Sequence, residues 1–150
     1  MASARPSSFT LTKPGPLRLY SMTELLRLPP PTWLVRDILP AGGLVGLYGQ
    51  PGHYKSFVAI DIALSVATGL PWHNHDVSKG HVIYVAAEGG TGIGKRAWAW
   101  LIEHNVDPTA ADISWLTESI PVSVDSENMD RLFGRINDEL QREPGLVVID

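Results

Sequence analysis

The sequence predicts an α/β fold in which a mostly parallel sheet carries helices on both faces. Short apolar runs bounded by glycine alternate with segments of helical length along the chain. Parallel strands need long crossover connections, and a helix between two strands supplies one. The runs are almost continuously apolar, so the strands are expected to be buried on both faces of the sheet.

Composition permits one core and excludes several classes of protein. The 150 residues are 44% hydrophobic and 19% charged, which is ordinary for a globular chain and argues against general disorder. The net charge of -4 gives no basic footprint for nucleic acid. The chain has no cysteine, which excludes disulfides and cysteine-ligated zinc. No apolar run reaches the ~20 residues of a membrane span, so no membrane partner is expected and the cytoplasm is the expected compartment.

Two segments precede the predicted core. Residues 1–18 are rich in serine and proline and are expected to form a flexible leader. Residues 19–32 read as a short helical and proline-rich linker, because Ser21 and Glu24 have capping-box spacing and a run of prolines follows. The domain itself is expected over residues 33–150.

Four buried strands and three helices are expected within the domain. The strands are residues 43–49 (GLVGLYG), 81–88 (HVIYVAAE), 113–117 (ISWLT) and 145–150 (GLVVID). The helices are residues 55–69, closed by Gly69, residues 94–105, and a third with Met129, Leu132, Phe133, Ile136 and Leu140 on one face.

The last predicted strand stops at Asp150. A buried parallel strand normally leads into another crossover, and an end here leaves edges and apolar faces uncovered. We therefore expect a domain truncated after this strand, as a fragment of a longer protein or a reading frame that ends early.

The stretch GQPGHYKS is the main candidate for a phosphate site. A P-loop surrounds phosphates with backbone N–H groups at a helix start, while its lysine neutralises charge and its Ser or Thr hydroxyl ligates Mg²⁺. Lys55 and Ser56 stand where this chemistry needs them. The residues predicted to bind nucleotide are Gly49, Gln50, Pro51, Gly52, His53, Tyr54, Lys55, Ser56 and Phe57. The alternative is an ordinary Gly/Pro turn before a buried helix.

Tyr54 departs from the P-loop pattern G-x-x-x-x-G-K-[ST], because it stands where the second glycine belongs. We expect Tyr54 to take a negative φ in the first helical turn, with its ring turned away from the phosphates. Gly52 would then take the positive φ.

A second glycine-rich stretch, GGTGIGKR, supplies both glycines and the lysine but ends in Arg96. A guanidinium cannot ligate a cation, so this stretch lacks the metal function and is interpreted as a glycine loop without phosphate contact. Lys95 and Arg96 are interpreted as a solvated helix start, with phosphate or DNA contact as the alternative.

Two carboxylates end predicted strands. Asp150 ends GLVVID, which has the form of a Walker B strand, and would hold Mg²⁺ through its water shell. Glu88 ends the strand at residues 81–88, at the sheet edge where α/β ligand sites lie, and could polarise a water for attack on a γ-phosphate. For each, the alternative is an ordinary acid at a strand end.

The order Lys55, Ser56, Glu88, Asp150 resembles that of RecA-like P-loop ATPases, which include hexameric replicative helicases and recombinases. Residues 39–73 followed by KGHVIYVAAEGG look like the RepA-type AAA-family ATPases of phages and plasmids. The resemblance implies a RecA-like P-loop NTPase core, with ATP and Mg²⁺ as cofactors. It also implies that Glu88 is the catalytic base and that GGTGIGKR is the loop behind Glu88. Lys55 is the second residue predicted to act in catalysis, because it would hold the β- and γ-phosphates.

The resemblance further implies a homo-oligomer, a hexameric ring, that hydrolyses ATP between subunits and moves on single-stranded DNA. The leading hypothesis is the ATP-binding motor domain of a replicative helicase. The neighbour's finger residue and the DNA-contacting loops are not found in this stretch, so we expect ATP·Mg²⁺ binding with little or no turnover. The alternatives are a recombination ATPase, a small-molecule P-loop kinase, and a non-catalytic nucleotide-binding fragment.

Overall fold

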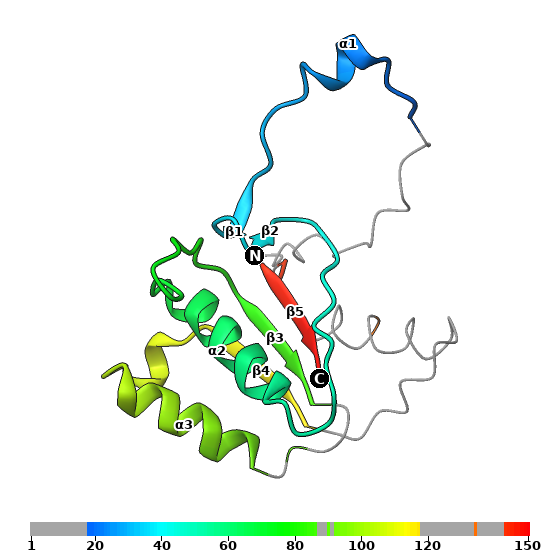
Figure 1. The fold of residues 1–150 in the computed structure, drawn as a ribbon. Helices are drawn as coiled ribbons and strands as arrows, with labels where there is room; N and C mark the ends of the chain where they lie inside the picture. Colours follow the sequence, from blue (N-terminus) through cyan, green and yellow to red (C-terminus); the bar gives the residue numbers. More distant parts are fainter. Residues whose placement is uncertain (1–17, 87–89, 91, 118–133, 135–142) are drawn as a thin grey trace, which may run out of the picture.

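A computed structural model describes residues 18–86, 90, 92–117, 134 and 143–150. Within them the chain forms a small antiparallel hairpin and a three-stranded parallel sheet with two long helices on it (Figure 1). The helix predicted around residues 129–140 and the predicted catalytic base Glu88 lie outside the described residues.

The first described element is the short helix α1, Met22–Leu25, on an arm that extends away from the sheet in Figure 1. The predicted capping box is confirmed. The hydroxyl of Ser21 accepts from the backbone N–H of Glu24 at 3.3 Å, and the Glu24 carboxylate accepts from the backbone N–H of Ser21 at 2.9 Å. Every residue in the range 18–32 is exposed, so this helix depends on its cap and not on packing.

A hairpin then joins the arm to the body. Strand β1, Trp33–Val35, pairs antiparallel with β2, Leu39–Pro40, and Val35 also bridges to Val77. Val35 is fully buried in the main core. No alternating pattern of apolar and polar residues marks this hairpin, because its strands are only three and two residues long.

The parallel sheet has β3, Val82–Val85, at its centre, flanked by β4, Ile113–Leu116, and β5, Leu146–Ile149. Both pairings are parallel, so the predicted parallel sheet is confirmed for the described strands. All four residues of β3 are buried, as their continuous apolar character requires. The sheet order places the ends of β3 and β5 side by side.

Two helices cover one face of this sheet. Helix α2, Lys55–Thr68, packs on all three strands, and α3, Ile93–Glu103, packs against α2. Gly69 closes α2 in a left-handed conformation with φ 81°, and its N–H donates to the carbonyl of Ser65 at 2.8 Å. A short 3₁₀ turn, Pro108–Ala110, leads from α3 toward β4.

The carboxylate of Asp61 ties the two helices together. It accepts from the indole N–H of Trp72 at 2.8 Å and from that of Trp100 at 2.6 Å. His73 lies 3.3 Å from the same carboxylate. One side chain on α2 thus holds α3 and the turn after α2 in place.

The strand predicted at residues 43–49 is absent: this segment is a coil whose residues are all exposed. Leu44 and Tyr48 are almost entirely open to solvent, and Val45 and Leu47 are half exposed. A strand needs a neighbour to satisfy its N–H and C=O groups, and none of the described strands pairs with this segment. Apolar character alone therefore misled the prediction.

Candidate functional site

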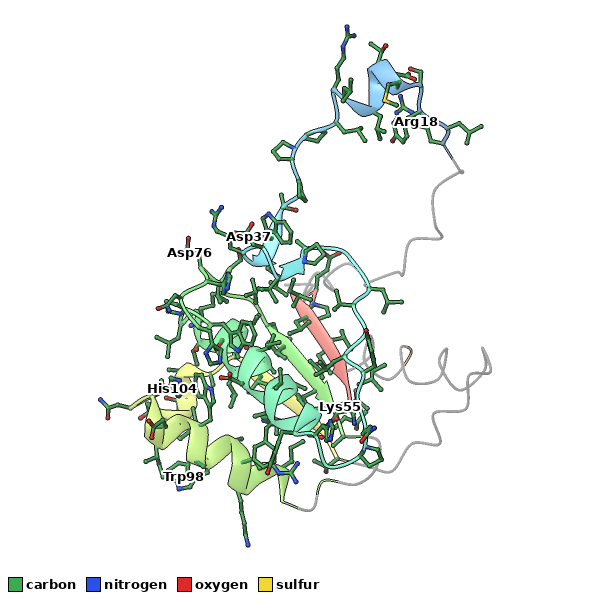
Figure 2. The ribbon with its side chains drawn as sticks, viewed as in Figure 1. Arg18, Asp37, Lys55, Asp76, Trp98 and His104 are labelled. Carbon is green, nitrogen blue, oxygen red and sulfur yellow. The ribbon has the colours of Figure 1, made fainter. Side chains whose placement is uncertain are left out.

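The segment from Gly49 to Ser56 leads from the coil into α2 at the edge of the sheet where β5 ends (Figure 2, where Lys55 is labelled). His53 N–H donates to the carbonyl of Gln50 at 3.3 Å and closes a turn. Gly52 takes a positive φ of 82°, as expected. Loops of this kind, in which left-handed residues alternate with others, turn successive N–H groups toward one side and suit anions.

Tyr54 does not take the conformation that the sequence led us to expect. Its φ is +56°, in the left-handed region, and it is the N-cap of α2, so the helix begins only at Lys55. The position before the lysine needs the left-handed conformation that glycine adopts freely, and here tyrosine adopts it at a cost in strain. The residue is 72% exposed, and its ring meets the ring of Phe57 edge-on at 5.7 Å.

Lys55 folds back over the loop that precedes it. Its ammonium donates to the carbonyls of Gly49, at 2.9 Å, and Gln50, at 3.0 Å. Both partners are neutral backbone acceptors in an exposed setting. The ammonium is therefore held at the loop without a neutralising carboxylate among these contacts.

Ser56 and Asp150, which are 94 positions apart in sequence, meet at the edge of the sheet. The Ser56 hydroxyl lies in the first turn of α2 and donates to one carboxylate oxygen of Asp150, directly after β5, at 3.0 Å. Asp150 N–H in turn donates to the carbonyl of Val85 at 2.9 Å, which continues the pairing of β5 with β3. The sheet and the helix thus fix both partners.

This pair fits a magnesium ion by its chemistry. A hydroxyl and a carboxylate are hard oxygen ligands, and Mg²⁺ bound with a nucleotide uses one or two protein oxygens, phosphates and waters. Among the described residues, no group of three or more His, Cys, Asp or Glu side chains could hold a metal ion by itself. The Ser56–Asp150 pair brings two side chains with hard oxygen atoms to one point of the sheet edge.

Sequence reasoning missed Tyr84, which contacts the second oxygen of Asp150. Its hydroxyl donates to that oxygen at 2.8 Å from the middle of the central strand. Burial, and then the hydrogen bond and the negative charge of Asp150, raise the pKa of the Tyr84 phenol well above its ordinary value. The phenol is therefore a neutral donor at physiological pH. Its place in the strand that precedes Glu88 is the one sequence signal that could have drawn attention to it.

Lys55, Ser56 and Asp150 line a hollow of about 700 Å³. Its walls come from the loop, the first turn of α2, the end of β5 and α3, and the lining residues are Pro51, Gly52, His53, Tyr54, Lys55, Ser56, Phe57, Arg96 and Asp150. The volume lies within the range of small-ligand sites. Of the predicted nucleotide-binding residues, Gly49 and Gln50 contribute to the site through their carbonyls on Lys55.

Arg96 brings a second cation to this hollow. Its guanidinium lies 4.6 Å from the centre of the Phe57 ring, in a cation–π geometry. Lys95 and Arg96 are both exposed in the first turn of α3, in agreement with the solvated helix start that the sequence favoured. Both line a neighbouring depression between α2 and α3, and Arg96 also lines this hollow. The described part of GGTGIGKR approaches the site through Arg96.

Comparison with known proteins gives one family. A protein-family model described as an AAA domain matches residues 18–150. No curated protein and no solved structure gives a significant match. Among the helices that the structure describes, none combines the length and apolar character needed to cross a membrane.

Proposed function

This chain belongs to the AAA domain family, and from that premise we propose that it is the ATP-binding domain of a DNA-dependent ATPase. Membership of this family supports the part of the proposal that makes the chain a nucleotide-binding ATPase. The further proposal is a hexameric ring, of the replicative helicase type, that acts on single-stranded DNA. Its support is the resemblance of residues 39–73 and 79–90 to RepA-type ATPases.

One observation carries the proposal of ATP·Mg²⁺ binding: the 3.0 Å contact between Ser56 and Asp150 beside Lys55. An ordinary Gly/Pro turn before a buried helix does not require a hydroxyl at the helix start to contact a carboxylate 94 positions away. A site for phosphates and Mg²⁺ requires this arrangement, because both oxygens must face the same ion.

The roles of the residues follow from their chemistry. The ammonium of Lys55 would exchange two neutral carbonyl acceptors for phosphate oxygens, and a hydrogen bond to an anion is the stronger one. Ser56 would ligate the metal and Asp150 would hold it through its water shell. The charge of the metal would offset that of the phosphates. Glu88 would orient the attacking water, as the resemblance implies.

The test is equilibrium binding of ATP, with Mg²⁺ present, to the parent and to Lys55→Ala. Charge-assisted hydrogen bonds contribute about 1.5–3 kcal/mol, so we expect Lys55→Ala to weaken binding roughly 10- to 100-fold. Lys79→Ala is the matched control, because within the described part of the chain the Lys79 ammonium donates only to the carbonyl of Ala110. Hydrolysis by the pure chain is expected to be slow or undetectable.

If the parent and Lys55→Ala bind ATP with equal affinity, the nucleotide site does not lie at this loop. The same conclusion follows if Lys79→Ala loses as much ATP affinity as Lys55→Ala. Rapid steady-state hydrolysis by the pure chain, abolished in Lys55→Ala, would leave the site intact. It would contradict the dependence of turnover on a neighbouring subunit.

A further inference from the structure

Both oxygens of the Asp150 carboxylate have donors on different elements. Ser56 donates to one oxygen at 3.0 Å and Tyr84 donates to the other at 2.8 Å. The Ser56 hydroxyl is the group that a metal would share. The Tyr84 hydroxyl contacts the other oxygen and comes from the buried strand β3.

The Tyr84 ring is fixed by packing on both sides. It is fully buried in β3, within the core cluster that includes α2. Trp115, its partner in register on β4, places its ring centre 4.9 Å away. On the other side Tyr84 is in register with Val148 of β5, two positions before Asp150. The hydroxyl therefore meets Asp150 from a rigid strand and not from a loop.

We propose that Tyr84 is a positioning residue for the metal site. Its hydroxyl holds the Asp150 carboxylate in the one orientation in which the free lone pairs of the carboxylate face an ion beside Ser56. The proposal rests on the proposed function, since it assumes a nucleotide-bound Mg²⁺. Partners that orient a metal ligand typically change metal affinity or activity by about 10- to 100-fold when removed. Tyr84 acts on the metal only through Asp150.

The identity of the ion should matter. Mg²⁺ demands near-ideal octahedral geometry, whereas Ca²⁺ accepts a flexible one with more ligands. If the carboxylate is free to rotate, its contribution to binding should therefore fall more for Mg²⁺ than for Ca²⁺. A purely structural role for Tyr84 would lower stability without this difference between ions.

The experiment measures the affinity of a fluorescent ATP analogue in EDTA, in Mg²⁺ and in Ca²⁺. For Tyr84→Phe we expect the parent's affinity in EDTA and a gain on adding Mg²⁺ that is about 10-fold smaller than in the parent. The gain with Ca²⁺ should fall less. Ser56→Ala is the positive control. Thr68→Val is the matched negative control. It removes a half-buried hydroxyl in α2 whose hydrogen bonds, among the residues that the structure describes, are all to backbone groups of its own segment.

The possible outcomes separate the two proposals. A parent that does not bind the analogue, or gains nothing from Mg²⁺, contradicts the proposed function itself. If the affinity of the parent rises with Mg²⁺ and that of Tyr84→Phe rises equally, the positioning role alone is overturned. The same holds if the substitution reduces the gain with Mg²⁺ and the gain with Ca²⁺ by equal factors. Circular dichroism checks the fold, and a variant that melts near the assay temperature is measured in sucrose, which favours the folded state.

Discussion

At the scale of single residues, Tyr54 and Tyr84 show why a side chain's meaning depends on its backbone. Tyr54 takes the left-handed conformation that usually belongs to glycine, and tyrosine reaches it only against steric repulsion. Tyr84 lies in a regular strand, and its importance comes from a carboxylate 66 positions later in the chain. No local sequence pattern predicts either feature. The conformation of Tyr54 is a matter of its φ angle, and the contact of Tyr84 with Asp150 depends on the order of the strands in the sheet.

Replacement of Tyr54 by glycine should remove the strain, whereas alanine at this position should keep it. The left-handed conformation costs a non-glycine residue about 1–2 kcal/mol, and glycine loses roughly 0.5–1 kcal/mol in chain entropy. We therefore expect Tyr54→Gly to be more stable than Tyr54→Ala by up to about 1.5 kcal/mol in urea unfolding.

Exposed Tyr48 provides the control, since it is not among the residues with positive φ. There glycine should be less stable than alanine. If the order of the two substitutions is the same at both positions, Tyr54 is not held in the left-handed region.

At the scale of elements, the sequence predicted those that have a strong period or clear ends. Gly69 closes helix α2 as expected, and α1 has its predicted capping box. The prediction of a strand at residues 43–49 was wrong, because an apolar run shows only that a segment can be buried. None of the described strands pairs with this segment. The contact of α3 with α2 was equally invisible, since Asp61 shows no sign in sequence of serving two tryptophans.

Loss of the Asp61 carboxylate should loosen α3 from α2. In Asp61→Ala two indole N–H groups lose their acceptor, and an unsatisfied buried donor costs about 1–3 kcal/mol. Because Trp100 is buried and Trp72 partly so, we expect a loss of roughly 2–4 kcal/mol, measured by urea unfolding and tryptophan fluorescence.

Asp76→Ala serves as the comparison, because Asp76 forms an exposed ion pair with Arg36 at 3.3 Å. Such pairs contribute about 0.2–1 kcal/mol, so its effect should be small. Equal stability of the two variants would show that Asp61 does not join the helices.

At the scale of the whole molecule, the site depends on elements that are distant in sequence. The loop and α2 supply Lys55 and Ser56, β5 supplies Asp150, β3 supplies Tyr84 and α3 supplies Arg96. The sequence placed three of these at one sheet edge by a general rule, that parallel strands end together and helices start there. Tyr84 and Arg96 required the actual packing of β3 and α3, which no single-sequence pattern states.

The division between arm and body gives the last prediction. Residues 18–32 are exposed throughout, whereas Leu34 and Val35 are buried against the body. A chain that begins at residue 29 should thus unfold within about 0.5 kcal/mol of the full chain, as expected for changes away from the core. A chain that begins at residue 37 loses both core side chains and should be at least about 2–5 kcal/mol less stable. Urea unfolding of the three chains at one protein concentration measures both effects, and a marked loss in the chain from residue 29 would show that the arm belongs to the folded core.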